Sequence, residues 1–328
     1  MTDNGEMIME RIRFAYADMW NNFNPDWFRL IRILKEKYDI VTDYENPDYV
    51  ICGPFGHDYL KYDCPRIFYT GEALAPDFNL YDYAIGFDHI DFSVRYLRVP
   101  IYALETEHFA LAKQKHELPD EFYLGKERFC NFVVSNGNGI PEREQFFKKL
   151  CERKKVDSAG RYLNNMPDGK NVDDKIEFQK QYKFTIAFEN SIMDGYITEK
   201  IVQAWAAGTV PVYYGGNGVA KDFNRKAFID VTEFESMDAC IEHVLYLDEH
   251  PEAYLRIAKE PIFVPGHETD LDYEGKILAF FEQIFHPQDG YKYRRNSKRT
   301  MWGGAYEQGI RENTASIRER LRKCISRK

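Results

Sequence analysis

Short apolar runs alternate with helical patterns through the first third of the chain. The apolar runs are RIRFAYA (11–17), DYVICGPFG (48–56), PRIFYTGE (65–72) and YDYAIGF (81–87). In WFRLIRILKEKY (27–38), Phe28, Ile31 and Leu34 recur at helical spacing, and Pro25 and Asp26 suit the start of a helix. Strands that alternate with helices predict βαβ units and a parallel sheet.

A second series of the same kind begins at residue 131, after a charged, irregular stretch at 105–128. It predicts strands at 131–136, 183–188, 209–215 and 228–231, and helices at 143–154, 198–208 and 237–258. Gly208 ends the 198–208 helix as a C′ glycine does. The chain is therefore predicted to be an α/β protein with two Rossmann-like domains, residues 1–126 and 127–285, followed by a partly helical basic tail, 286–328. In such folds, ligands bind at the carboxyl ends of the strands.

Composition supports a globular protein. Hydrophobic residues make up 44% and aromatic residues 16% of 328, which predicts a well-filled core. The net charge of −9 is uneven: residues 291–328 hold twelve Lys or Arg and three Glu, so residues 1–290 carry −18. The acidic body argues against nucleic-acid binding, whereas the basic end suits a weak contact with anionic lipid.

Cysteine spacing and the N-terminal sequence bear on the compartment. Six scattered cysteines without a C-x-x-C pair indicate neither a disulfide framework nor a zinc site. MTDNGEMIMERIRFAY carries acids where a signal peptide needs bases, and no stretch reaches 18 apolar residues. We expect a cytoplasmic protein.

The stretch FENSIMDGYITEK (188–200) crowds polar side chains between a predicted strand and a predicted helix. Thr198 suits the N-cap, which places Glu199 and Lys200 in the first helical turn. A helix start and an ammonium group together favour a diphosphate ligand. The alternative, in which both residues are ordinary solvated side chains, is about as plausible from spacing alone.

Two further stretches offer candidate chemistry. In SNGNGIPEREQFFKK (135–149), a glycine-rich turn leads into a helix with Arg143, although a plain β-turn-α link with a surface arginine is the better explanation of that stretch taken alone. In FYTGEALAPDF (68–78), Glu72 follows a predicted strand, where a carboxylate can act as a base on a hydroxyl; turn acids are common at such positions as well.

These motifs together resemble the α-1,3/4-fucosyltransferases of glycosyltransferase family GT10, above all the bacterial, soluble members. The matching segments are FENSIMDGYITEKIVQAWAAGTVPVYYG, VAKDFN, FIDV, FVVSN with Arg143, VDSAGR and FYTGEALAPDFNLYDYAIGFD, in that family's order. The resemblance implies a GT-B fold, with two Rossmann-like domains that face a central cleft. It further implies inverting transfer of L-fucose from GDP-β-L-fucose to a GlcNAc or Glc hydroxyl of a β-galactoside, such as N-acetyllactosamine or lactose.

The resemblance also assigns roles by position. Glu72, in the acceptor-binding domain, would be the general base. The donor residues would be Ser135, Asn136, Arg143, Asn190, Tyr196, Glu199 and Lys200, with Glu199 supporting the developing oxocarbenium ion and pairing with Lys200 before the donor arrives. No metal or other cofactor is required, although a divalent metal that stimulates without being essential is compatible. Acceptor contacts from Asp18, Trp20, Asn21 or Asn24 lie in a region that matches only weakly.

Two other readings stay open. A GT-B transferase that uses another GDP-sugar, such as GDP-mannose, has the same diphosphate machinery. A catalytically silent nucleotide- or glycan-binding protein keeps the fold, but it has no need of a base at Glu72.

Overall fold

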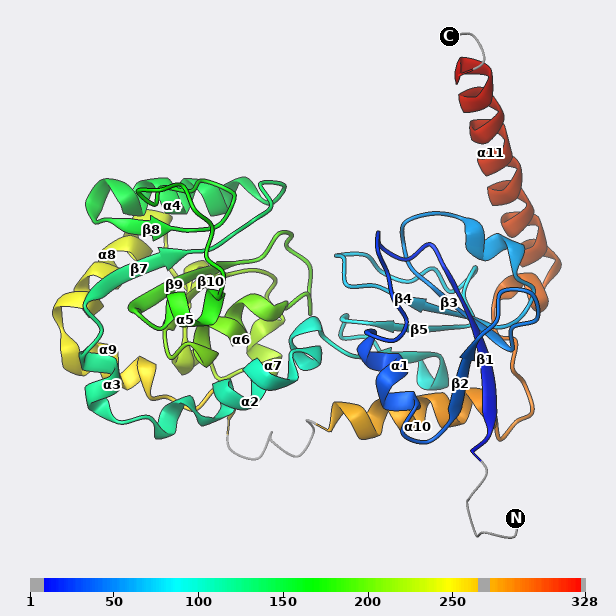
Figure 1. Ribbon diagram of the computed structural model, residues 1–328, viewed down its shortest axis with the longest axis horizontal. Helices are drawn as coiled ribbons and strands as arrows, with labels where there is room; N and C mark the ends of the chain where they lie inside the picture. The colour runs from blue at the N-terminus through cyan, green and yellow to red at the C-terminus, as the bar shows by residue number, and fades with distance from the viewer. Residues whose placement is uncertain (1–8, 265–271, 326–328) are drawn as a thin grey trace. The chain divides into compact units, whose positions relative to one another are not determined.

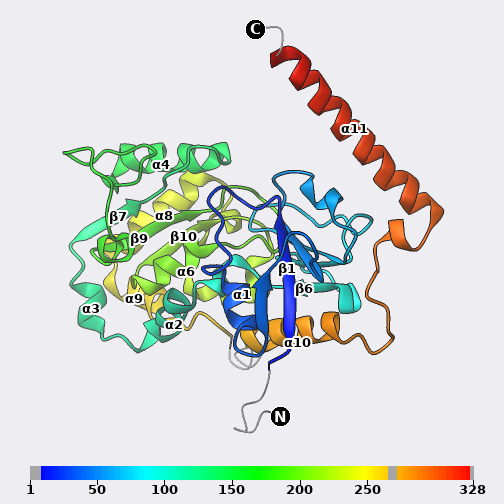
Figure 2. The same cartoon turned by 45° about the vertical axis from the view of Figure 1, so that its right-hand side comes forward.

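The structure is a computed structural model that describes residues 9–264 and 272–325, with side chains up to Thr314. The chain forms two units. The first contains residues up to Gly86, Ile90–Val99 and the chain from Asp272 onward; the second contains Phe87–His89 and the chain from Pro100. Figures 1 and 2 show a parallel sheet in each unit.

The first unit is built on a six-stranded parallel sheet in the order β2-β1-β3-β4-β5-β6. Its strands are β1 (Arg11–Ala17), β2 (Asp39–Thr42), β3 (Tyr49–Cys52), β4 (Arg66–Tyr69), β5 (Tyr83–Gly86) and β6 (Tyr96–Arg98), and its helices are α1 (Arg29–Leu34), α10 (Tyr273–Phe285) and α11 (Met301–Ile325). Every residue of β3, β4 and β5 is buried, as expected for central strands of a parallel sheet covered on both faces.

The second unit is built on a five-stranded parallel sheet in the order β11-β10-β9-β7-β8. Its strands are β7 (Arg128–Phe132), β8 (Val156–Ser158), β9 (Tyr182–Phe188), β10 (Val210–Tyr214) and β11 (Ile229–Asp230). Its helices are α2 (Thr106–Gln114), α3 (Asp120–Leu124), α4 (Pro141–Arg153), α5 (Lys175–Gln179), α6 (Glu199–Ala206), α7 (Val219–Asp222), α8 (Met237–Glu249) and α9 (Pro251–Ala258). The prediction of an α/β chain with two Rossmann-like parallel sheets is confirmed.

The strand order of the second unit reverses at β7. The chain passes from β7 through α4 to β8 on one side, then through α5 to β9 on the other side of β7. Such a reversal leaves a crevice at the carboxyl ends of the two strands that flank it, because the connecting helices cover opposite faces of the sheet. The second unit therefore has a ready ligand position at the carboxyl ends of β7 and β9.

The expected domain limits, 1–126 and 127–285, differ from those of the structure. Helix α2 lies before residue 126 but packs on α6 of the second unit. Helix α10 lies before residue 285 but belongs to the first unit, where Phe281 and Phe285 contact the ring of Phe14 in β1. The chain thus returns to its first unit, a crossing that local patterns do not reveal.

The first part of the basic segment 286–328 is held in the first unit by buried charges. Asp82, which is fully buried, accepts hydrogen bonds from the backbone N–H groups of Arg294 at 2.5 Å and Arg295 at 2.9 Å. Arg295 is itself fully buried and pairs with Asp82. In α11, Glu307 accepts two 3.1 Å hydrogen bonds from the buried guanidinium of Arg66. A helix over the end of this segment would place Ile317, Leu321 and Cys324 on one apolar face, but their side chains lie outside the described residues.

Two helix predictions need correction. The helix expected from Pro25 begins at Arg29, because residues 25–27 form a turn and Phe28 is the N-cap. The helix expected over 237–258 is two helices, α8 and α9, that meet at His250. Pro251 starts α9, and proline has no N–H to continue the hydrogen bonds of α8.

Candidate functional site

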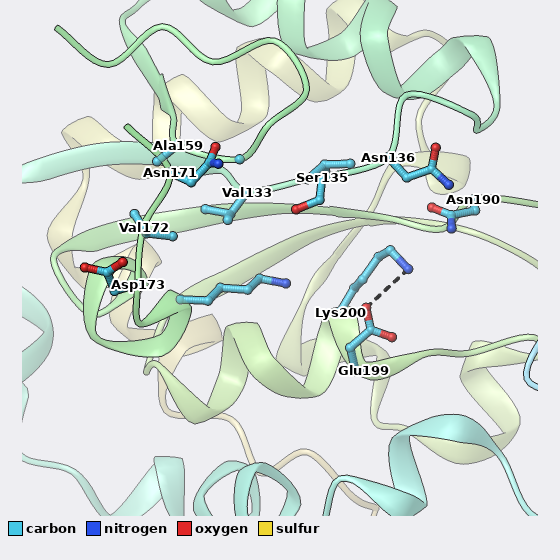
Figure 3. A pocket seen from close by; sticks show the side chains of 13 residues that line it. Val133, Ser135, Asn136, Ala159, Asn171, Val172, Asp173, Asn190, Glu199 and Lys200 are labelled. Atoms are coloured by element: carbon cyan, nitrogen blue, oxygen red, sulfur yellow. Dashed lines mark ion pairs between the residues drawn. The ribbon is translucent and has the colours of Figure 1, made fainter. Parts of the chain in front are cut away.

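A cavity of about 340 Å³ opens at the carboxyl ends of β7, β8 and β9, beside the first turn of α6. This is the crevice that the strand reversal predicts. It is lined by Val133, Val134, Ser135, Asn136, Ala159, Gly160, Asn171, Val172, Asp173, Lys175, Asn190, Glu199 and Lys200. Figure 3 shows Asn136 and Asn190 at one end of it, and Ala159, Asn171 and Val172 at the other. Five of the seven expected donor residues thus line one pocket, all but Arg143 and Tyr196.

The wall between β7 and β8 depends on a glycine. A Cβ atom on Gly160 would lie 2.1 Å from the carbonyl oxygen of Val134, so no other residue fits without moving the chain. Tyr162 secures the same contact, because its backbone N–H donates to the Val134 carbonyl at 3.0 Å. The close approach of these two segments shapes the apolar part of the pocket.

Arg143 holds two residues at the polar end of the pocket, although it does not itself line the cavity. Its guanidinium donates from Nη1 to Oδ1 of Asn190 at 2.6 Å, and from Nη2 to the backbone carbonyl of Asn136 at 2.7 Å. Arg143 is only 1% exposed, and its burial lowers the pKa of the guanidinium. Gly139 makes room for it, since a Cβ there would lie 2.6 Å from Nη2. The arginine therefore orients two pocket residues, and its expected contact with a diphosphate stays a prediction.

Lys200 lines the pocket together with another lysine, Lys175. Its Nζ donates to the hydroxyl of Thr198 at 2.8 Å and lies 3.2 Å from Glu189 and 3.5 Å from Glu199. Burial disfavours the charged ammonium, but the two carboxylates prevail and raise the pKa of Lys200 above its ordinary value. The expected pairing of Glu199 with Lys200 is present, and Figure 3 marks it with a dashed line.

Thr198 occupies the N-cap of α6, as predicted, but it caps the helix in an unexpected way. Its hydroxyl makes no hydrogen bond to a helix N–H. The hydroxyl donates instead to Glu189 at 2.6 Å, and the Thr198 backbone N–H donates to the other oxygen of the same carboxylate at 2.8 Å. The start of α6 is thus held by Glu189, at the end of β9.

Tyr196 lies in the same unit but does not line this cavity. It is 3% exposed, and its ring packs edge-on against Phe87 with the centroids 5.0 Å apart. Gly195 precedes it with φ +76°, a conformation that favours glycine. Tyr196 therefore lies outside the lining of the cavity, although its phenol is close enough to Lys200 to help raise the pKa of that ammonium, and its contact with donor stays a prediction.

Glu72 lies in the first unit, three residues after the end of β4, and is exposed. The loop is anchored by Thr70, whose hydroxyl accepts from the Glu72 backbone N–H at 2.9 Å. Nearby, Trp20 is 41% exposed and its ring lies 6.3 Å from that of Tyr69. Asp18, an expected acceptor contact, instead accepts from the backbone N–H groups of Asp58 and Tyr59, each at 2.8 Å.

Two residues of the site were not assigned from the sequence. Glu189 was visible as a carboxylate directly after an apolar strand, but its complete burial and its contacts with Thr198 and Lys200 appear only in the structure. Lys175 lines the cavity from the short helix α5 and donates to Oε1 of Gln203 at 2.7 Å. No sequence motif surrounds Lys175, so only the fold could have found it.

The described part of the chain contains neither a metal-binding cluster nor a membrane-spanning helix. Among the described side chains, in residues 9–264 and 272–314, no three His, Cys, Asp or Glu residues gather as a metal-ion site would require. Among the helices of those same residues, none has the length and apolar character needed to cross a bilayer. The five cysteines whose side chains are described are free thiols.

Comparisons with known proteins match both units. The family model "Alpha-(1,3)-fucosyltransferase FucT N-terminal domain" matches residues 13–105, and "Glycosyltransferase family 10 (fucosyltransferase) C-term" matches residues 123–259. Alpha-(1,3)-fucosyltransferase FucT of Helicobacter pylori is 36% identical over 318 residues, which cover 83% of this chain and 66% of that protein. A putative fucosyltransferase of Acanthamoeba polyphaga mimivirus is 25% identical and covers 80% of this chain, which spans 45% of its length.

Solved structures agree. A crystal structure of an alpha1,3-fucosyltransferase with GDP-fucose superposes with a TM-score of 0.74 at 33% identity, and the match covers 86% of this chain and 92% of that one. The two parallel sheets and this match confirm the α/β fold of the GT-B type. The chain belongs to the fucosyltransferases of glycosyltransferase family 10.

Proposed function

We propose that this chain transfers L-fucose from GDP-β-L-fucose to a hydroxyl of GlcNAc or Glc in a β-galactoside, with inversion, to give an α-1,3 linkage. The observation that carries the proposal is the pocket at the carboxyl ends of β7 and β9, which combines Lys200 with the first turn of α6. A family relative has been solved with GDP-fucose, and another bears the name of an α-(1,3)-fucosyltransferase.

The donor pocket suits a nucleoside diphosphate. The ammonium of Lys200 and the backbone N–H groups of the first α6 turn favour phosphate oxygens. Ser135, Asn136 and Asn190 add hydrogen-bonding groups at the ends of the neighbouring strands. As the bond to GDP breaks, positive charge develops on the sugar, and the carboxylate of Glu199 would stabilise it. These groups need no metal ion or other cofactor to act, and a stimulating divalent metal is tested by adding EDTA.

Inversion requires a base behind the attacking hydroxyl and no covalent nucleophile. Glu72 fits the role of base, because a carboxylate on an exposed loop at the end of β4 is accessible to an acceptor. The partly exposed ring of Trp20, packed on Tyr69 three residues before Glu72, suits the apolar face of an acceptor sugar.

The deciding experiment mixes the chain with GDP-fucose and either N-acetyllactosamine or lactose, and follows GDP release and product linkage. A fucosylated product with inverted configuration supports the proposal. Transfer from GDP-mannose but not from GDP-fucose would replace it with another GDP-sugar transferase. Tight GDP binding without turnover on any acceptor of a defined panel would replace it with a silent binding protein.

We also propose a cytoplasmic location, with a weak peripheral contact between the basic residues after 291 and anionic lipid. Arg294, Arg295, Lys298 and Arg311 are paired with carboxylates of the first unit, so the other cations of this segment would make the contact. Co-sedimentation with vesicles of phosphatidylserine, against phosphatidylcholine alone, tests it.

A further inference from the structure

Glu189 is a carboxylate with no access to solvent. It directly follows the last residue of β9 and is 0% exposed, and its backbone N–H is used up in a 2.9 Å hydrogen bond to the carbonyl of Tyr214. Burial of an ionised carboxylate is costly unless several donors meet it. Glu189 has three: the backbone N–H of Thr198 at 2.8 Å, the hydroxyl of Thr198 at 2.6 Å and the ammonium of Lys200 at 3.2 Å.

These contacts join two elements beside the donor pocket. The carboxylate comes from the end of β9, while Thr198 is the N-cap and Lys200 the second residue of α6. The hydroxyl of Thr198 donates to Glu189 and accepts from Lys200 at 2.8 Å, so it links the carboxylate to the ammonium a second time. One buried side chain thereby sets both the start of α6 and the position of its ammonium group.

The ammonium of Lys200 is shared between two unequal carboxylates. Glu189 lies 3.2 Å away with its side chain fully buried, whereas Glu199 lies 3.5 Å away with 31% of its side chain exposed. Glu199 lines the cavity and Glu189 does not. A ligand that enters the cavity therefore meets the Glu199 side of the ammonium. Partly solvated ion pairs are weak, whereas removal of one partner from a buried pair is costly.

We propose that Glu189 is a positioning residue that holds Lys200 and the start of α6 for the donor diphosphate. Glu199, in contrast, is the carboxylate whose contact with Lys200 is replaced by the diphosphate when the donor binds. The inference rests on the proposed function, because it takes the diphosphate of GDP-fucose as the ligand. It separates two acids that lie ten residues apart and contact the same ammonium. Glu199 is then free to face the sugar while Lys200 stays in place.

A double-mutant cycle on GDP affinity tests the first part. GDP binding is measured by calorimetry for the parent chain, Glu189→Gln, Lys200→Ala and the double variant. Because Glu189 acts largely through Lys200, Glu189→Gln should weaken GDP binding about tenfold, and the loss in the double variant should be clearly smaller than the sum of the two single losses. Additive losses, or unchanged affinity in Glu189→Gln, would overturn the proposal. Glu242→Gln, which removes an exposed partner of Arg153, is the control and should bind GDP as the parent does.

A second variant covers the case in which Glu189→Gln does not fold. Thr198→Val removes the hydroxyl that links Glu189 to Lys200, and it too should weaken GDP binding in the parent chain. In the Lys200→Ala background, the same substitution should weaken GDP binding much less. Parental GDP affinity in Thr198→Val would count against the positioning role.

The second part concerns Glu199. Glu199→Gln removes a negative charge from the pocket, so GDP should bind as tightly as to the parent or more tightly, while kcat falls. A loss of GDP affinity as large as that of Glu189→Gln would contradict the assigned difference between the two acids. Failure of the proposed function looks different: the parent chain itself would then bind GDP without transferring fucose, whatever the cycle shows.

Discussion

Arg143 and Asn190 are joined by a 2.6 Å hydrogen bond across 47 residues of sequence. The bond joins the first turn of α4 to the loop after β9. The other terminal nitrogen of Arg143, Nη2, donates to the backbone carbonyl of Asn136 after β7. The two strands that flank the topological reversal are thus clamped at their carboxyl ends by one side chain. The pocket has a fixed polar end because of this clamp.

Arg143→Lys should weaken GDP binding about tenfold or more, because an ammonium cannot bridge both acceptors with the planar fork of a guanidinium. The loss of one buried hydrogen bond costs roughly 1 kcal/mol or more, close to that factor. Calorimetric titration with GDP measures it. Arg153→Lys, on the last turn of the same helix and exposed, is the matched control, and equal affinities of the two variants would refute the clamp.

Glu72→Gln should lower kcat by roughly 10² to 10⁴, the usual contribution of a general base, and leave GDP affinity unchanged. The separation follows from the fold, because Glu72 is in the first unit and the pocket is in the second. Steady-state kinetics and GDP titration measure the two quantities. Glu45→Gln, an exposed acid of the same unit, is the control, and near-parental turnover of Glu72→Gln would remove Glu72 from the base role.

The sheets were predictable from sequence where strands are continuously apolar, and less so elsewhere. The apolar runs at 11–17 and 183–188 match β1 and β9 closely, because most side chains of both strands are buried. Strand β2 was hidden, because DIVT follows the α1 pattern without a break. Strand β6 has three residues, two of them only half-buried, and left no pattern to detect.

The site was predictable where its residues are close in sequence. Asn190, Glu199 and Lys200 fall within eleven residues, and the helix start itself signals an anion site. The contacts that organise the pocket are long-range: Arg143 reaches Asn190, and Lys175 comes from a helix with no motif. Such contacts depend on the strand order, which local patterns do not determine.

Glu307→Gln should destabilise the first unit at neutral pH and flatten its acid sensitivity. Burial opposes ionisation of Glu307, but hydrogen bonds from Arg66 and Ser297 prevail and lower its pKa from 4.5 to about 2. Because the folded-state pKa lies below the unfolded one, the stabilisation is complete above pH 4.5 and is lost as the pH falls toward 2. A shift of this size is worth on the order of 3 kcal/mol, since one pKa unit is about 1.4 kcal/mol.

Calorimetric unfolding at pH 7 and pH 3 measures this difference, with GDP added to mark the transition of the second unit by its upward shift. The gap between the parent and Glu307→Gln should narrow at the lower pH. Glu312→Gln, on the exposed side of the same helix, is the control. A gap that stays constant with pH would show that the buried pair with Arg66 does not depend on the charge of Glu307.

Gly160→Ala should damage the donor pocket more than the stability of its unit. The added Cβ would lie 2.1 Å from the Val134 carbonyl, so the chain between β7 and Asn136 must move. Overpacking of this kind destabilises a protein by about 1–3 kcal/mol. The displaced segment carries Ser135 and Asn136 of the pocket, so the loss of GDP affinity should exceed what this strain alone explains.

Gly169→Ala is the control: φ is +60° there, with no atom within 4 Å of the new Cβ. It should lower the unfolding temperature slightly and leave GDP affinity intact. If both variants bound GDP as the parent does, the close contact between the β7 and β8 loops would not shape the donor pocket.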